Sequence, residues 1–445
     1  MPANIWDLMQ ICAVGAALAL SDFVAGPCSA ASATGAVIAV DARVEEFSGG
    51  ARLVFDLSGT VEASAFVLAD PDRVVIDLPE VNFQINSPAP KHSTGRSVKP
   101  ALVQAYRFGA LGAGRSRIVI DLAAPARITR ADSQKIGLGD PSRLVIELKP
   151  VNRAEFLALA ETGARAQAPQ RAPLVPAAAI VRDAKPLIVL DPGHGGIDAG
   201  ASGAGGAIEK LLVLEFARSL AQKLEADGHY RVLLTRHSDV FVSLGERVQI
   251  ARDAQAALFV SLHADTLAGA AEVQGATVYT LAEKASDAEA GRIADKENQS
   301  DSAAGVISRD DSGGINDILF ELTRRETRAY SHLFARTLVG VWQGGGRLNK
   351  NPQRAAGFKV LRAPDVPSVL VELGYLSSQR DAADLGSVTW REKTAETLTR
   401  SINGFFAVRS NDAPVETGAL PGPIVPASAN PLAGMVPPVP AVAGK

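Results

Sequence analysis

The stretch LIVLDPGHGG, residues 187–196, decides the fold class of the second half of the chain. Its first four residues are apolar and predict a short buried strand, and the glycines after them allow a sharp turn of the backbone. His194 follows this strand at the end where open α/β sheets gather functional side chains. The stretch therefore predicts an α/β domain with an imidazole at a strand's carboxyl end.

The residues around this stretch extend the same pattern from 186 to 408. Apolar strands alternate with amphipathic helical periods, which is typical of an α/β domain with an open, mixed sheet flanked by helices. The predicted strands are 187–190, 232–234, 258–262 and 369–371. The predicted helices are 208–226, 244–254, 316–342 and 390–406.

Residues 36–150 have a different texture and contain an internal repeat. RLVFDL at 52–57 recurs as RIVIDL at 117–122, and DPDRVVIDL at 70–78 recurs as DPSRLVIEL at 140–148. Each is an alternating strand pattern, and the second pair begins with an Asp-Pro turn. Two similar sheets facing each other would bury both apolar faces, so we expect an all-β sandwich before the α/β domain.

The remaining segments and the overall composition limit the class of protein. A chain of 445 residues favours two domains, and its net charge of -3 argues against a nucleic-acid partner. Residues 1–33 are interpreted as a signal peptide, because they contain an apolar stretch followed by small residues. The start of this peptide is atypical, because no Lys or Arg precedes the apolar stretch. We expect a linker at 151–185, a disordered Pro- and Ala-rich tail at 409–445, and no transmembrane segment in the mature chain.

Acidic residues and histidines stand at several predicted strand and helix ends. His263 ends the third strand, Glu372 ends the fourth, and Glu209 begins the first helix, where the helix dipole would also favour it. Two His and one Glu, with a further free Glu, form the ligand set of a hydrolytic zinc site. The pattern predicts one Zn²⁺ bound by His194, Glu209 and His263, with Glu372 as the general base.

These motifs resemble those of the zinc-dependent N-acetylmuramoyl-L-alanine amidases that separate daughter cells. The resemblance covers 187–406 and rests on 191–196, 209–210, 235–236, 244, 247, 261–264, 357–358, 360–361, 364, 367 and 371–372. It implies the same roles for His194, Glu209, His263 and Glu372. Two positions depart from the family: Asp265 and Ser378 stand where Asn is usual.

The resemblance implies a function as well as a fold. Residues 36–150 resemble the AMIN domain, a two-sheet module associated with peptidoglycan binding, and the expected reaction is hydrolysis of the amide bond between N-acetylmuramic acid and L-alanine. Such an enzyme would act in the periplasm, in daughter-cell separation and wall remodelling. Two alternatives remain open: a zinc peptidase that cuts within the stem peptide, and a wall-binding protein without turnover.

The segment 283–314 is longer and more acidic than a strand-to-helix connection requires. One interpretation is a solvated surface loop. The other is an inhibitory segment in which Glu297 fills the open position on the zinc, with Asp295 and Asp301 as substitutes. In the family that it resembles, the corresponding segment blocks the site until an activator with a LytM-type domain displaces it.

Several arginines have two interpretations each. Arg354 suits a carboxylate of the substrate, because a guanidinium fork matches that group, but a structural ion pair fits as well. Arg52, Arg73, Arg117 and Arg143 occupy matching repeat positions. They would form either a symmetric contact surface for the cell wall or, as the favoured interpretation, solvated strand starts.

Overall fold

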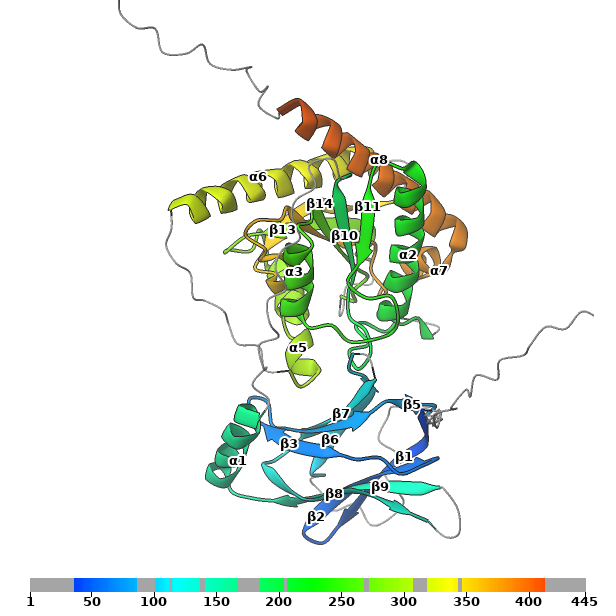
Figure 1. The fold of residues 1–445 in the computed structure, drawn as a ribbon, viewed down its shortest axis with the longest axis vertical. Coiled ribbons are helices and arrows are strands. Elements are labelled where there is room, and N and C mark those ends of the chain that lie inside the picture. Colours follow the sequence, from blue (N-terminus) through cyan, green and yellow to red (C-terminus); the bar gives the residue numbers. More distant parts are fainter. Residues whose placement is uncertain are drawn as a thin grey trace, which may run out of the picture. The chain divides into compact units, whose positions relative to one another are not determined.

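The structure is a computed structural model, and it describes residues 36–85, 101–112, 114–136, 141–166, 185–203, 206–267, 272–306, 318–342 and 346–412. The strands of these residues form three sheets. Figure 1 follows their order along the chain by colour. The signal peptide predicted for 1–33 lies outside the described residues. Among the described helices, none is long and apolar enough to cross a membrane.

The first two sheets confirm the predicted all-β sandwich. Their strands are β1 (Val37–Phe47), β2 (Gly50–Leu57), β3 (Ser64–Leu68), β4 (Arg73–Pro79), β5 (Val81–Phe83), β6 (Val103–Ala110), β7 (Arg115–Leu122), β8 (Ala126–Lys135) and β9 (Ser142–Pro150). One sheet has the order β5-β1-β2-β9-β8 and the other β3-β4-β7-β6. Apolar side chains of both sheets, such as Phe55 and Ile146 from one and Ile76 and Ile120 from the other, share one core.

The internal repeat makes the two sheets alike. Strand β2 pairs antiparallel with β9, and β4 pairs antiparallel with β7. Strands β2 and β7 share one repeated sequence, and β4 and β9 share the other. The centre of each sheet therefore contains one strand of each kind. The same side chains therefore recur at matching places on both outer faces.

The linker predicted for 151–185 is wrong in its first part. Residues Arg153–Ala166 form helix α1, and Phe156 is fully buried in the core of the sandwich. The Ala-rich sequence has a high helix propensity, and burial of the Phe156 ring stabilises the helix further. Residues 167–184 lie outside the described residues.

The third sheet is mixed and six-stranded, and its mixed character was predicted. It has the order β11-β10-β12-β15-β13-β14, in which only the β13–β15 pair is antiparallel. Its strands are β10 (Leu187–Pro192), β11 (Arg231–Leu234), β12 (Leu258–His263), β13 (Ala276–Leu281), β14 (Leu348–Ala356) and β15 (Ser368–Glu372). Because β10, β12 and β15 are adjacent and parallel, the residues that end them meet at one edge of the sheet.

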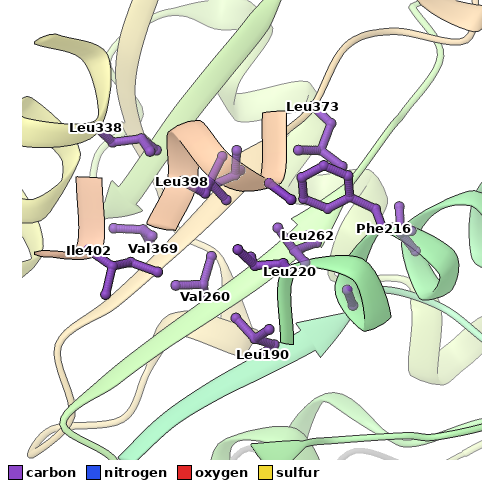
Figure 2. Packing of buried hydrophobic residues seen from close by; sticks show 14 of the residues in the cluster. Leu190, Phe216, Leu220, Val260, Leu262, Leu338, Val369, Leu373, Leu398 and Ile402 are labelled. Carbon is purple, nitrogen blue, oxygen red and sulfur yellow. The ribbon is translucent and has the colours of Figure 1, made fainter. Parts of the chain in front are cut away.

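Helices cover both faces of this sheet. They are α2 (Glu209–Asp227), α3 (Leu244–Asp253), α4 (Ala288–Glu297), α5 (Ser300–Ala303), α6 (Ile318–Val341), the 3₁₀ helix η3 (Lys359–Leu361), α7 (Gln379–Gly386) and α8 (Val388–Asp412). One face packs against α2, α6 and α8, whose Phe216, Leu338 and Leu398 belong to one core with Val260 of β12 (Figure 2). The other face packs against α3, α4 and η3.

Two predicted irregular segments contain helices. The segment 283–314 forms α4 and α5 before residue 307, and its remainder lies outside the described residues. The tail predicted to begin at 409 is helical up to Asp412, where α8 ends, and 413–445 lie outside the described residues.

Candidate active site

The predicted zinc ligands are held by the loop after β10, the start of α2 and the end of β12. His194 has a left-handed backbone, with φ of 58°, and the two glycines after it have positive φ as well. This loop turns the imidazole back over the edge of the sheet. His263 is the last residue of β12 and lies next to Glu372 of β15 in the parallel register.

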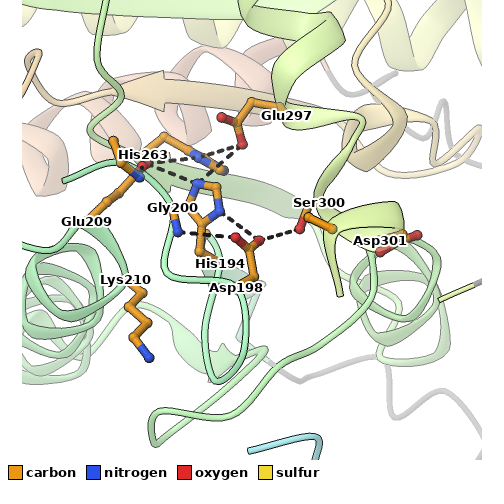
Figure 3. A network of polar contacts seen from close by, with 12 residues as sticks. His194, Asp198, Gly200, Glu209, Lys210, His263, Glu297, Ser300 and Asp301 are labelled. Carbon is orange, nitrogen blue, oxygen red and sulfur yellow. Dashed lines mark hydrogen bonds and ion pairs between the residues drawn. The ribbon is translucent and has the colours of Figure 1, made fainter. Parts of the chain in front are cut away.

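These side chains converge on one point, which Glu297 also reaches (Figure 3). Glu209 Oε1 lies 3.2 Å from His194 Nε2 and 3.3 Å from His263 Nδ1. Glu297 Oε2 lies 3.4 Å and 3.1 Å from the same two nitrogens. The structure thus brings together all three predicted ligands and the predicted inhibitory carboxylate.

Further contacts, made outside the cluster, fix the orientation of the predicted ligands His194 and Glu209. Asp198 Oδ2 lies 2.8 Å from His194 Nδ1, so the other ring nitrogen of His194 faces the cluster. The oxygens of Glu209 accept hydrogen bonds from the backbone N–H groups of Ala201 and Ala264, both at 2.8 Å. Such contacts set the direction of metal ligands before the metal binds.

The cluster fits a zinc ion. His194 Nε2 and His263 Nδ1 are buried and have no hydrogen-bond partner among the described residues. Zinc binds nitrogen and oxygen at about 2.0–2.1 Å, so the ligand atoms of a tetrahedral site lie roughly 3.3 Å apart. The contacts of 3.1–3.4 Å between these histidines and the two glutamates match that separation.

The electrostatics of the cluster also favour a cation. Burial by itself would lower the pKa of His263, but the carboxylates of Glu297 and Glu209 raise it to about 10. Burial acts in the same way on His194, and Asp198, Glu209 and Glu297 raise its pKa well above the usual range. Negative charge therefore dominates this point of the protein.

Glu372 lies beside the cluster and is completely buried. Its Oε2 accepts a hydrogen bond of 2.9 Å from the backbone N–H of Asp265, whereas Oε1 has no hydrogen-bond partner among the described residues. Burial, followed by the nearby carboxylates of Asp265 and Glu209, raises the pKa of Glu372 well above its usual value, although His263 opposes the shift. A carboxyl group with a raised pKa is suited to accept and return a proton.

Asp191 of β10 forms a buried hydrogen-bond network next to the site, and the sequence did not predict a role for it. Its carboxylate accepts hydrogen bonds from Thr235 at 2.6 Å, Ser261 at 2.7 Å and the Arg247 guanidinium at 2.6 Å. Burial alone would raise the pKa of Asp191, but Arg247 and the two hydroxyls hold it below the usual value. Arg247 also donates to the backbone oxygen of His194 at 2.8 Å, so this network fixes the loop that carries His194.

The segment that carries Glu297 is not a solvated loop, because its polar side chains bind specific partners. Asn298 donates to Gly357 O at 2.9 Å and accepts from Lys359 N at 2.7 Å. Ser300 donates to Asp198 at 2.5 Å, which links the segment to the carboxylate that orients His194. Glu297 and Ser300 are both buried.

Two of the acids considered as substitutes for Glu297 lie elsewhere. Asp301 is buried and accepts a hydrogen bond of 2.8 Å from the backbone N–H of Leu244, at the start of α3. Asp295 is exposed on α4. Lys296 forms an ion pair with Asp265, so this departure from the family motif provides a further contact for the segment.

Arg354 forms structural ion pairs, as in the second of its two interpretations. Its Nη1 lies 2.8 Å from Glu289 and 3.3 Å from Asp287, at the start of α4. Arg354 therefore anchors this end of the helix.

The sequence did not indicate the roles of Asp198 and Asp265. Asp198 stands four residues after His194. This spacing predicts their contact only when the loop between them is known to turn back. The contact of Asp265 with Glu372 depends on its backbone N–H, which no residue type reveals.

Comparison with known proteins shows the family of the chain. A family model described as N-acetylmuramoyl-L-alanine amidase matches residues 188–404, and a model of the AMIN domain matches residues 41–148. The N-acetylmuramoyl-L-alanine amidase AmiC of Escherichia coli O6:H1 is 30% identical over 385 residues, which are 84% of this chain and 91% of that relative. The chain belongs to the N-acetylmuramoyl-L-alanine amidase family. It is thus a peptidoglycan-processing amidase with an N-terminal AMIN domain.

Two further proteins resemble this amidase. AmiC of Neisseria meningitidis serogroup B is 30% identical over 365 residues, covering 80% of this chain and 86% of the relative. Among solved structures, AmiC2 of Nostoc punctiforme has 30% identity and covers 50% of this chain and 98% of its own, with a TM-score of 0.36.

Proposed function

We propose that this amidase uses one zinc ion, held by His194, Glu209 and His263, to cut the bond between the lactyl group of N-acetylmuramic acid and L-alanine. The observation that carries the proposal is the convergence of a carboxylate and two imidazole nitrogens beside a buried Glu372. Neither nitrogen has a hydrogen-bond partner among the described residues. When bound, zinc polarises the carbonyl of the amide and acidifies a water molecule.

The residues of the chain supply proton transfer and orientation. Glu372 is the general base: Oε1 takes the proton of the attacking water and passes it to the nitrogen of the leaving L-alanine. An amide needs that proton because an amine anion leaves poorly. Asp198 keeps His194 in the required orientation, and the two backbone N–H groups that bind Glu209 do the same for the carboxylate.

The bond that is cut separates the proposal from its alternatives. The test is mass spectrometry of fragments released from purified peptidoglycan by the full zinc-loaded chain carrying Glu297→Ala. Stem peptides that begin with L-alanine are expected. Fragments cut within the stem would indicate a peptidase, and no release by the folded protein would indicate a wall-binding protein.

We also propose that the resting amidase is inhibited by its own segment 283–314. Glu297 Oε2 occupies the fourth place of the cluster, 3.1 Å from His263 Nδ1 and 3.4 Å from His194 Nε2. A hydrolytic zinc needs that place for water and substrate. The burial of Glu297 and the contacts around it support a blocking role.

Replacement of Glu297 tests the inhibition directly. Glu297→Ala should raise stem release from purified peptidoglycan on the order of tenfold, because water and substrate can then enter the position that the Glu297 carboxylate occupies. Asp295→Ala, on the exposed side of the same helix, is the matched control and should leave the rate unchanged. An unchanged rate in folded, zinc-loaded Glu297→Ala would exclude this mode of inhibition.

The physiological setting is part of the same proposal. We infer export to the periplasm through residues 1–33, wall targeting by the AMIN domain, and release of the segment by an activator with a LytM-type domain during daughter-cell separation. The composition of residues 1–33 and the match to the AMIN model support this setting.

A further inference from the structure

The outer face of the β3-β4-β7-β6 sheet carries three arginines whose orientation is fixed by acids on neighbouring strands. Arg73 Nε lies 2.9 Å from Asp121 Oδ1, and Arg107 Nη1 lies 2.6 Å from Asp121 Oδ2. Arg117 Nε lies 2.6 Å from Asp77 Oδ1. A guanidinium has five N–H groups in a rigid fork, so each arginine keeps donors for another partner.

The remaining donors bind the end of the inhibitory segment. Arg107 Nε donates to Ala303 O at 2.6 Å, and Arg117 Nη1 donates to Gly305 O at 2.9 Å and to Ala304 O at 3.2 Å. Arg73 Nη1 donates to the backbone oxygen of Ser302, and to its hydroxyl at 2.8 Å. These carbonyls lie at the end of α5, where a helix leaves its oxygens without intrahelical partners.

An apolar contact accompanies these hydrogen bonds. Ala304 packs in one cluster with Val75 and Val119 of the sheet and with Ile197 and Phe241 of the catalytic domain. Gly305 has φ of +68°, and a Cβ at this position would lie 2.8 Å from Val75 Cγ2. The β3-β4-β7-β6 sheet, residues 302–305 and the catalytic domain belong to one compact unit, Val37–Lys445.

The other sheet of the sandwich provides an internal comparison. Arg52 and Arg143 occupy the matching repeat positions and pair with Glu147 at 3.0 Å and Asp56 at 2.8 Å. Their side chains are 38% and 41% exposed, whereas Arg73 and Arg117 are 14% and 4% exposed. The repeat therefore supplies the same arginine–acid pairs twice, and the segment 302–305 covers one copy.

We propose that the β3-β4-β7-β6 face of the AMIN domain is a docking surface for residues 302–305 of the same chain, and that it holds Glu297 in the zinc site. The inference rests on the proposed inhibition by Glu297. Only four residues lie between Glu297 and Ser302, and successive backbone hydrogen bonds between Asn298 and Val306 connect the two. Loss of the docked end therefore loosens the inhibitory carboxylate.

The test compares arginines at matching repeat positions in the full, zinc-loaded chain. Hydrogen exchange of the amides of 303–306, followed by mass spectrometry, reports docking without reference to activity. Arg117→Ala and Arg73→Ala should accelerate this exchange roughly tenfold or more, because each removes charge-assisted hydrogen bonds. Both should also raise basal stem release, while Arg52→Ala and Arg143→Ala change neither.

A second variant disturbs the contact from the side of the segment. Gly305→Ala should accelerate the same exchange, because its Cβ meets Val75 and Val119, and it leaves the sheet's ion pairs intact. Gly228→Ala is the matched control, since Gly228 also has a positive φ, +76°, but open space where the new methyl group would lie. This pair keeps the test informative if an arginine variant fails to fold.

The outcomes separate docking from inhibition. Unchanged exchange in Arg117→Ala, Arg73→Ala and Gly305→Ala would overturn the docking surface, even if Glu297→Ala activates the enzyme. Faster exchange with unchanged stem release, in a chain that Glu297→Ala does activate, would overturn the claim that docking holds Glu297 in place. If Glu297→Ala does not activate the enzyme, the proposed inhibition fails, and the exchange rates alone decide whether the surface exists.

Discussion

Asp198 has two partners that belong to different parts of the site. Its Oδ2 lies 2.8 Å from His194 Nδ1 and accepts a hydrogen bond of 2.5 Å from the hydroxyl of Ser300 in the segment 283–314. Burial by itself would raise the pKa of Asp198, but His194 and these hydrogen bonds hold it well below the usual range. The carboxylate therefore carries its negative charge beside His194 in this fold.

Loss of Asp198 should weaken zinc binding. We expect Asp198→Ala to bind zinc roughly 10–100-fold more weakly, because an outer carboxylate fixes the tautomer and direction of its histidine. Competition with a chelator measures the affinity, and Asp295→Ala serves as the control. An affinity equal to that of the unchanged chain would show that His194 needs no such partner.

Gly200 lies against two of the proposed zinc ligands, His194 and Glu209. Its φ is +66°, and a Cβ would lie 2.6 Å from His194 Cδ2 and 2.7 Å from Glu209 Oε2. Gly200→Ala should therefore displace both ligands and reduce the zinc content of the purified protein. Gly228→Ala imposes a similar backbone strain of about 1 kcal/mol in open space and should keep its zinc. Equal zinc contents would contradict the close packing described for this loop.

Among the elements, α3 and β10 are joined by a buried ion pair. Arg247→Met should lower the free energy of unfolding by about 3–5 kcal/mol, because it leaves the Asp191 carboxylate buried without its cation. Denaturant unfolding measures the change. Arg252→Met, which removes a half-exposed pair with Asp365 on the same helix, should cost about 1 kcal/mol or less.

The same pair predicts a dependence on pH. The pKa of Asp191 is lowered in the folded protein, so its contribution to stability is present above the unfolded value of about 4. This contribution is lost as the pH falls through the folded pKa. The difference in stability between the unchanged chain and Arg247→Met should therefore be largest above about pH 4 and shrink below it. A difference independent of pH would show that Asp191 does not ionise in the fold.

Most elements were predictable because their signals are local. The strand at 187–190 is a continuous apolar run, and the strand at 258–262 is apolar except for Ser261. The helix predicted at 208–226 has an apolar stripe and forms as Glu209–Asp227. Helix α1 was missed because Ala-rich residues before a Pro-rich stretch carry no clear apolar period. Helices α4 and α5 were missed as ordered elements because several of their buried residues are polar and are stabilised by partners elsewhere in the chain.

Across the chain, the convergence of the proposed zinc ligands was predictable, and the contact of residues 302–305 with the β3-β4-β7-β6 sheet was not. His194, His263 and Glu372 lie at the ends of neighbouring strands, and a parallel sheet brings such residues together. The contacts from Arg73 and Arg117 to 302–305 join positions about 190–230 residues apart, through backbone oxygens that leave no trace in the sequence. The arginines were therefore interpreted as solvated strand starts, which the burial of Arg117 contradicts.

We propose that Glu372 drives amide hydrolysis at a zinc site that Glu297 otherwise blocks. The most direct measurement is the rate of stem release from purified peptidoglycan by the zinc-loaded chain carrying Glu297→Ala, with and without Glu372→Gln. We expect stems that begin with L-alanine from the first protein, and a rate roughly 100–10,000-fold lower with equal zinc content from the second. Equal rates from the two proteins would contradict the role of Glu372.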